Sequence, residues 1–172
     1  MITRNNLEGG VASTAVYSDC EHYRYSLRRV WEPKEQKIIF ILLNPSTATE
    51  LRNDPTVERC ERRARVLGFG AFIVCNIFAW RDTNPEKMKL AIDPIGEHNN
   101  KAIVEGCYWA DKLICAWGTH GSHLNRGDEV LAIIRKIPKT LYHLGLTKHG
   151  LPKHPLYLSY KQKPLIWTHN NV

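Results

Sequence analysis

The stretch at residues 37–48, Lys-Ile-Ile-Phe-Ile-Leu-Leu-Asn-Pro-Ser-Thr-Ala, decides the fold class. It opens with a continuous apolar run of strand length, and a run without alternation is typical of a strand buried on both faces of a parallel sheet. Asn44 and Pro45 end the run, because both residues favour turns. The stretch therefore predicts a central strand that delivers a polar loop to one edge of a sheet.

Three more short apolar runs follow along the chain, at residues 71–76, 112–117 and 140–144. Segments in which apolar residues recur at helical spacing alternate with these runs, at 55–67, 84–90, 97–109 and 125–137. Asp54 followed by Pro55 is a typical start of the first of these helices. The alternation predicts an α/β protein, a three-layer sandwich with a central four-stranded, mainly parallel sheet.

The N-terminal part of the chain has a different pattern. Residues 23–31 alternate between the two faces of a strand, which indicates an antiparallel edge strand. We expect this strand to pair with residues 15–19. The sequence thus predicts an N-terminal antiparallel hairpin in addition to the central sheet.

Length and composition limit the class of protein. The chain has 172 residues, which fits one domain spanning 1–172. No stretch approaches the ~18 apolar residues of a membrane helix, and the N-terminus lacks the apolar core of an export signal. The five cysteines include no Cys-x-x-Cys pair, which argues against a zinc ribbon or a disulfide framework. We expect a cytoplasmic monomer without metal or cofactor.

The net charge of +7 is distributed unevenly. All acidic residues lie at or before Glu129, and the segment after it carries basic residues alone: Arg135, Lys136, Lys139, Lys148, Lys153, Lys161 and Lys163. A basic excess confined to one segment is typical of a surface that binds a polyanion. A solvated basic tail would give the same pattern, so charge alone leaves both interpretations open.

A polar or aromatic cluster follows each predicted parallel strand. The carboxyl ends of parallel strands meet at one edge of a sheet, and ligands of such folds bind there. Amide side chains pair with base edges, aromatic rings stack on bases, and lysines hold phosphates, so the combination suits recognition of a nucleobase. The clusters begin at Asn44, Asn76, Trp117 and His154.

In order and content these clusters resemble the uracil-DNA glycosylase superfamily. Asn44-Pro45-Ser46 resembles its water-activating loop, Asn76 falls where the base reader stands, and Trp117-Gly118 falls at the end of the third strand. The loop His154-Pro155-Leu156-Tyr157-Leu158-Ser159 is similar to the loop that supports the departing base and wedges into the duplex. The whole chain is also similar to an uncharacterised bacterial and phage family with Asn-Pro-Ser-Thr-Ala and His-Pro-Leu-Tyr-Leu signatures.

The resemblance implies a DNA glycosylase that hydrolyses the N-glycosidic bond of a damaged, mismatched or modified base, with DNA as its partner. It implies catalytic roles for Asn44 and His154, with Asp54 as a further candidate. Base-binding roles fall on Asn76, Phe78, Pro45, Ser46 and Trp117. DNA-binding roles fall on Lys148, Lys153, Leu156, Tyr157, Ser159 and Lys161.

One departure from the superfamily pattern concerns catalysis. Efficient members place an aspartate in the first loop, whereas this chain has Asn44 there and Asp54 as the nearest carboxylate. An asparagine can position a water molecule but cannot accept its proton. Catalysis would then depend on stabilisation of the leaving base by His154, or on Asp54 if the loop folds back.

Two other classes of function remain open. The first is a non-catalytic protein that binds nucleic acid or a nucleotide in the same crevice, and the second is a small-molecule hydrolase or transferase on the same fold.

Structural roles also compete with the functional ones. Asn44 and Asn76 could be turn residues, and Trp117 could belong to the core. His120 and His123 have helical spacing but no Cys or carboxylate partner nearby in sequence, so surface histidines are favoured over a metal site. The arginines of 55–67 could bind phosphate. However, Arg62 follows Glu58 and Arg65 follows Glu61 by four residues, which is typical of a solvated helix face.

Overall fold

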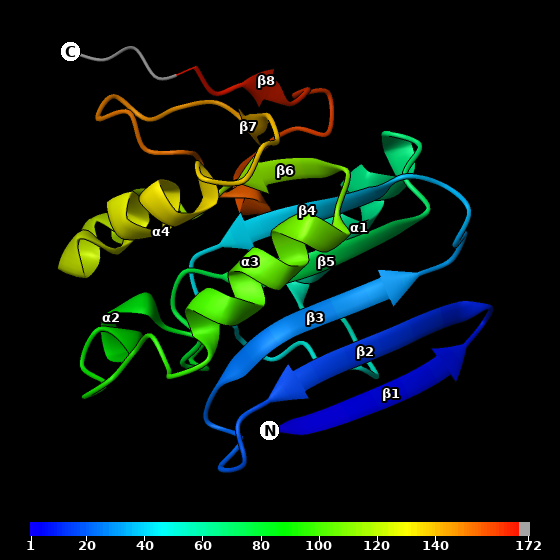
Figure 1. Cartoon of the computed structure of the whole chain (residues 1–172), viewed down its shortest axis with the longest axis horizontal. Coiled ribbons are helices and arrows are strands. Elements are labelled where there is room, and N and C mark those ends of the chain that lie inside the picture. Colours follow the sequence, from blue (N-terminus) through cyan, green and yellow to red (C-terminus); the bar gives the residue numbers. More distant parts are fainter. Residues whose placement is uncertain (169–172) are drawn as a thin grey trace.

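The computed structural model describes residues 1–168, which form one eight-stranded mixed sheet with helices against it (Figure 1). The strand order is β1-β2-β3-β5-β4-β6-β7-β8. The strands are β1 Ile2–Glu8, β2 Val11–Tyr17, β3 Arg24–Val30, β4 Lys37–Leu42, β5 Ala71–Asn76, β6 Lys112–Cys115, β7 Leu141–His143 and β8 Leu165–Ile166. The helices are α1 Pro55–Val66, α2 Pro85–Met88, α3 Asn99–Trp109 and α4 Arg126–Ile134, with 3₁₀ segments η1 Thr119–Asn125 and η2 Pro155–Tyr157.

The parallel strands β5, β4, β6 and β7 are adjacent in the sheet. Their register places Leu42 opposite Asn76, and Ile41 opposite Cys115. β5 is buried throughout, and β4 is buried apart from the partly exposed Lys37. Side chains of both strands therefore face apolar surroundings on either side of the sheet, as the unbroken apolar runs predicted.

Helices cover both faces of these central strands. On one face, Ile39 and Cys75 pack with Ile103 of α3 and Ile134 of α4. On the other face, Phe40 and Phe72 pack with residues of α1, among them Val57, Cys60 and Ala64. In Figure 1, α3 crosses in front of β4 and β5, whereas no helix of residues 1–168 crosses in front of β1 and β2.

The start of α1 is as predicted. The Asp54 carboxylate accepts a hydrogen bond from the backbone N–H of Val57 at 2.9 Å, and Pro55 occupies the first helical position. Pro55 fits there because the first N–H of a helix has no partner inside the helix. Gly68 follows the helix with a φ of +82°, a conformation that glycine adopts at little cost.

The prediction of a four-stranded, mainly parallel sheet is wrong. The observed sheet has eight strands, and four of its neighbouring pairs are antiparallel whereas three are parallel. The N-terminal strands do not form a separate hairpin, because β3 pairs directly with β5 and extends the same sheet. β3 is therefore an interior strand rather than the predicted edge strand, and β1 lies at the edge.

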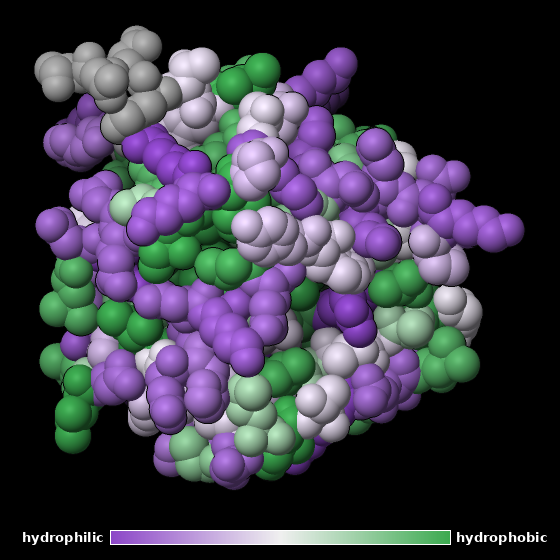
Figure 2. Space-filling view, viewed as in Figure 1, coloured by the Kyte–Doolittle hydropathy of each residue, from purple (hydrophilic) through white to green (hydrophobic). Residues whose placement is uncertain are grey.

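The hydrophilic character of the surface agrees with the composition. Figure 2 shows that hydrophilic side chains dominate the face that carries α3 and α4, with smaller hydrophobic areas between them. Among residues 1–168, no helix combines the length and the apolar character that crossing a bilayer would require.

A candidate active site at the carboxyl edge of the parallel strands

Backbone hydrogen bonds hold the loops after β4, β5 and β6 side by side. The N–H groups of Ile77 and Phe78 donate to the carbonyls of Leu42 and Leu43, both at 2.9 Å. The N–H of Ala116 donates to the carbonyl of Ile41 at 2.8 Å. The loops that begin at Asn44, Asn76 and Trp117 therefore leave the sheet from neighbouring positions at one edge.

Asn44 has a fixed orientation. Its Nδ2 donates to the carbonyls of Pro45 and Asp82, at 3.2 and 2.8 Å. Because both neighbours are acceptors, the amide nitrogen must face them and Oδ1 must face away. The side chain is half-buried, and no other residue of 1–168 donates to this oxygen. Asn44 thus presents an oriented hydrogen-bond acceptor.

Asp54 connects the first loop to α1. Its Oδ1 accepts from the N–H of Val57, and its Oδ2 accepts from the N–H of Ala48 at 3.2 Å. The loop does fold back, since this second bond joins the carboxylate to the end of the Asn44–Ala48 segment. Asp54 is buried, so its negative charge acts on its surroundings with little screening by water.

Arg24 is a cation on which the charge of that carboxylate acts, and sequence reasoning missed it. Its guanidinium is fully buried and donates to the carbonyl of Ala48 at 2.6 Å. Burial lowers the pKa of Arg24 to about 10, and the charge of Asp54 opposes the shift. The alternation of residues 23–31 placed Arg24 on the same side of the strand as Ser26 and Arg28, and gave it no functional role. No signal in the sequence indicates that the neighbouring loop covers it.

His154 is neutral at physiological pH. Burial lowers the pKa of its imidazole to about 4, and the negative charge of Asp54 counteracts this only in part. Its Nδ1 accepts from the N–H of Leu156 at 3.4 Å. Nδ1 is therefore the unprotonated nitrogen, and Nε2 carries the proton. His154 thus presents a hydrogen-bond donor.

A glycine lets His154 approach the end of the third parallel strand. A Cβ atom on Gly118 would lie 3.3 Å from the Cβ of His154, and Gly118 has a φ of +74°, which favours glycine. The N–H of Gly118 donates to the carbonyl of Pro152 at 2.7 Å. These contacts bring the loop of residues 152–154 back to the sheet edge from which it is distant in sequence.

Two aromatic residues predicted to bind the base are in the core. Phe78 and Trp117 are both buried, with Phe78 against His123 and Trp117 against Trp167, each at 5.7 Å between ring centroids. Gly121 packs directly on the Trp117 indole. The expectation that these rings bind a base is therefore corrected, because neither presents a face outside the core.

Asn76 keeps its amide free. The residue is 2% exposed, and within residues 1–168 no hydrogen bond engages its side chain. Its backbone carbonyl accepts from Nδ2 of the buried Asn99 at 2.9 Å, which fixes the end of β5. In the first loop, Pro45 is buried and Ser46 is half-buried, and the Pro45 carbonyl accepts from the N–H of Asp82 at 3.0 Å.

Two arginines of α1 hold the C-terminal loop, residues 154–162, by its backbone. Arg59 donates to the carbonyls of Pro155 and Leu158. Arg63 donates to the carbonyls of Ser159 and Gln162, at 3.0 and 2.6 Å. The prediction of a solvated arginine face is therefore wrong for these two residues. It is confirmed for Arg65, which pairs with Glu61 at 2.7 Å.

With its backbone held, the C-terminal region displays its side chains. Tyr157 is 91% exposed, and Leu156 is half-buried. The other predicted DNA-binding residues are exposed as well: Lys148, Lys153, Ser159 and Lys161. The lysines on either side of His154 in the chain are therefore open to solvent, and together they are called the basic surface below.

Candidate metal ligands and cavities were sought in the same region. Residues 1–168 contain no cluster of three or more His, Cys, Asp or Glu side chains suited to a metal ion. His120 instead lies 3.6 Å from Glu86. Three cavities border the antiparallel strands β1–β3 rather than the sheet edge.

Fold and site together define the class: an α/β protein with a mixed sheet, whose polar loops gather at the carboxyl edge of its parallel strands. The model of a family described as a protein of unknown function, DUF1643, matches residues 24–156. The chain therefore belongs to the DUF1643 family. The matched range contains Asn44, Asp54, Asn76 and His154. No curated protein and no solved structure matches the chain.

Proposed function

We propose that this protein is a DNA N-glycosylase that releases a damaged, mismatched or modified base, in the manner of the uracil-DNA glycosylase superfamily. One observation carries the proposal: an oriented acceptor on Asn44 and a neutral imidazole donor on His154 belong to loops that meet at the same sheet edge. A hydrolytic displacement at a sugar carbon needs both groups, one for the water and one for the departing base.

In the proposed reaction, Asn44 Oδ1 accepts a hydrogen bond from the attacking water. The water oxygen bonds to C1′ as the bond from C1′ to the base nitrogen breaks, and the base leaves with the electron pair. The water proton passes to solvent, because an amide cannot accept it. The sugar gains positive charge in such a transition state, and the buried negative charge of Asp54 stabilises it.

His154 stabilises the leaving group. A neutral imidazole donates a hydrogen bond from Nε2 to the negative charge that develops on the base, without first requiring a proton from solution. The low pKa of His154 keeps it in this form over the physiological range. Asn76, whose amide has donors and an acceptor available, reads the base edge.

The basic surface supplies the grip on DNA. Lys148, Lys153 and Lys161 contact phosphates, and the exposed Tyr157 fills the gap left by the flipped base, with Leu156 beside it. A DNA substrate implies a cytoplasmic location, which is part of this proposal.

The test is a mass-spectrometric screen for free bases released from uracil-containing, mismatched and phage-modified DNA, in the presence of a chelator. We expect one base to be released by the wild-type protein and not by His154→Ala. Release that persists unchanged in His154→Ala would contradict the role of His154, and no release from any DNA would contradict the proposal itself.

A second candidate is a non-catalytic nucleic-acid or nucleotide binder. The burial of Phe78 and Trp117 favours it, because these two aromatic base-binding candidates lie in the core and neither is free to hold a flipped base. This candidate requires salt-sensitive DNA binding that survives Asn44→Asp and His154→Ala, with no product from any of the three proteins.

A further inference from the structure

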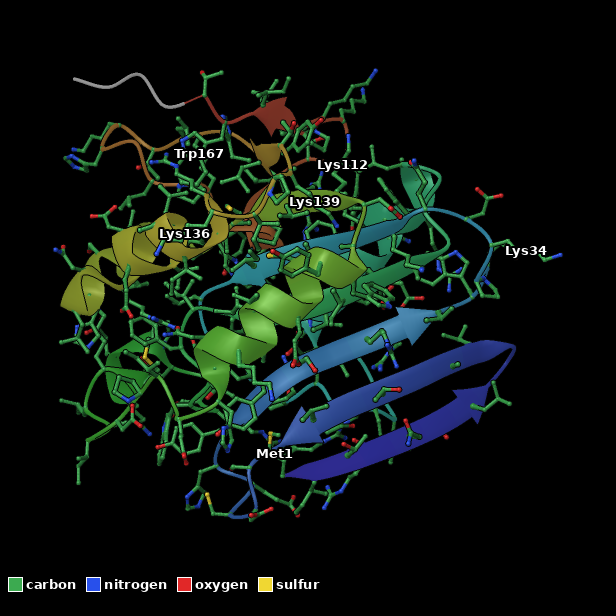
Figure 3. All side chains as sticks on the ribbon, viewed as in Figure 1. Met1, Lys34, Lys112, Lys136, Lys139 and Trp167 are labelled. Carbon is green, nitrogen blue, oxygen red and sulfur yellow. The ribbon has the colours of Figure 1, made fainter. Side chains whose placement is uncertain are left out.

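A cavity of about 420 Å³ lies between α3 and the strands β2 and β3, on the sheet face that α3 only partly covers. Its volume falls within the range of small-molecule sites. It is lined by β2, β3 and α3, and the catalytic candidates Asn44, Asp54 and His154 take no part in it. Met1 borders the cavity and lies near the start of β1, below α3 in Figure 3.

The floor and one wall of the cavity are apolar. Val16 of β2 and Ile73 of β5 face it, together with Ala102 and the Trp109 ring of α3. Ala102 and Trp109 belong to one stripe of α3, because helical residues at these spacings share a face. A flat or compact apolar group would find a matching surface here.

An irregularity in the sheet turns an aromatic ring toward the cavity. Val16 pairs with Ser26 and Tyr17 pairs with Arg24, so Tyr25 is an extra residue in β3. Such a bulge redirects a side chain, and bulges are frequent beside binding sites. The Tyr25 ring lines the cavity and meets the His98 ring edge-on at 5.7 Å between centroids.

The charged groups at the rim are mainly cationic. The Arg28 guanidinium lies 5.6 Å from the centre of the Trp109 ring, and within residues 1–168 it has no ion pair. Lys101 also lines the cavity and lies 3.8 Å from Glu105, the single carboxylate among the lining residues. The rim therefore attracts an anion, and Arg28 is free to bind it.

We propose that this cavity binds a small organic anion with a flat apolar body. The body lies against Val16, Ile73 and Ala102, and the anionic group pairs with Arg28, supported by Lys101. A guanidinium stacked on an indole keeps its outer N–H groups directed away from the ring, which suits a carboxylate, sulfonate or phosphate. This site is independent of the proposed DNA chemistry at the strand ends.

The test compares two fluorescent probes of nearly the same shape: anilinonaphthalene sulfonate, which is anionic, and phenylnaphthylamine, which is neutral. We expect the folded protein to bind the anionic probe at one site, and to bind the neutral probe about tenfold more weakly, as expected for loss of a charge-assisted contact. Equal binding of the two probes, or no binding of the anionic one, would overturn the proposal.

Three variants locate the probe. Arg28→Gln should weaken binding of the anionic probe about five- to tenfold, and Ala102→Phe should abolish it by filling the cavity. Arg135→Gln, at an exposed arginine beyond α4, is the matched control and should leave binding unchanged. Thermal melts establish that each variant is folded. If Arg28→Gln and Arg135→Gln have the same effect, or if folded Ala102→Phe still binds, the probe occupies another surface and the inference is wrong.

Discussion

His154 shows how one backbone contact can set the chemistry of a side chain. The N–H of Leu156 occupies Nδ1, so the proton of the neutral ring must be on Nε2. Burial disfavours a second proton, which lowers the pKa of His154 to about 4. The same contact that shapes the loop therefore also makes the residue a donor rather than an acid.

This shift has a consequence for stability. The folded pKa lies below the ordinary value of 6.5, so the unfolded chain binds a proton at His154 between about pH 6.5 and pH 4 while the folded chain does not. Stability from this residue is complete above the unfolded pKa and falls as pH decreases through that window. We expect the wild type to lose about 2 kcal/mol more than His154→Gln between pH 7 and pH 4.5. Urea unfolding at both pH values measures it, and parallel losses would contradict it.

Asp54 accepts hydrogen bonds from two backbone N–H groups and supplies a negative charge near Arg24, and no neutral side chain of its size can do all three. Asp54→Asn has one acceptor oxygen, so its amide NH₂ must face the N–H of either Val57 or Ala48. The substitution also removes the negative charge that acts on buried Arg24. We expect a loss of about 2–4 kcal/mol in the free energy of unfolding. Asp128→Asn, an exposed carboxylate in the first turn of α4, is the control and should cost less than about 1 kcal/mol. Similar losses in the two variants would show that the buried network contributes little.

At the scale of elements, Lys139 and Arg59 each donate hydrogen bonds to backbone carbonyls of another segment. Lys139 Nζ donates to the carbonyls of Cys107, Tyr108 and Ala110 at the end of α3, where backbone acceptors lack partners inside the helix (Figure 3). Arg59 does the same for the C-terminal loop. In both cases the cation compensates acceptors that the local structure leaves free.

Lys139→Met should therefore destabilise the protein by about 1–3 kcal/mol, because it leaves three carbonyls without their donor. Lys136→Met is the matched control, since Lys136 is an exposed lysine three residues earlier, and it should cost less than about 0.5 kcal/mol. Thermal denaturation compares the two, and equal midpoints would argue against capping by Lys139.

Arg59→Met should loosen the C-terminal loop without unfolding the sheet. Hydrogen exchange should accelerate at the amides of residues 156–162 and stay unchanged in β4 and β5, because the sheet is stable without this contact. Arg65→Met, which removes an α1 arginine paired with Glu61 instead, should leave the loop as slow as in the wild type. Faster exchange in both variants would mean that α1 itself had loosened.

At the scale of the whole molecule, basic charge separates from acidic charge along the chain. If the basic surface grips DNA, the slope of log affinity against log salt should fall by about 2–3 in a variant with Lys148, Lys153 and Lys161 changed to Gln. The same change at Lys34, Lys87 and Lys89, which lie in the charge-balanced part, should leave the slope unaltered. Filter binding at several salt concentrations measures both, and identical slopes would rule out this surface as the phosphate contact.

The parts of the fold that depend on local pattern could be predicted, and the others could not. Residues 37–43 predicted a buried strand, and β4 is one, because an apolar run fixes burial on both faces. Residues 2–8 gave no such signal. Their side chains are mostly polar, and β1 is held by backbone pairing with β2. The sequence pattern did not predict β1 or the antiparallel pairing of β3 with β5. For that reason it predicted a mainly parallel sheet where the sheet is mixed.

The site divides in a similar way. That Asn44 and Asn76 lie at one edge follows from their places at the ends of neighbouring parallel strands, whereas His154 returns to that edge through contacts with Gly118. The burial of Trp117 depends on Gly121 and Trp167, and that of Arg24 depends on the loop at Ala48. Such contacts join distant parts of the chain, and a single sequence contains no trace of them.

The hydrogen bonds from α1 to the C-terminal loop affect which substitutions the loop can accept during evolution. Arg59 and Arg63 contact main-chain oxygens of four loop residues, Pro155, Leu158, Ser159 and Gln162. Every amino acid supplies that oxygen, so these contacts do not depend on the side chains at Tyr157, Ser159 and Lys161, which are exposed. Tyr160, under the arginines of α1, and Leu158, against the core, hold the loop by their side chains as well. Mutation can therefore change the surface at residues 157, 159 and 161 while the loop keeps its position. A library randomised at these positions would sample new binding partners on a loop of constant shape.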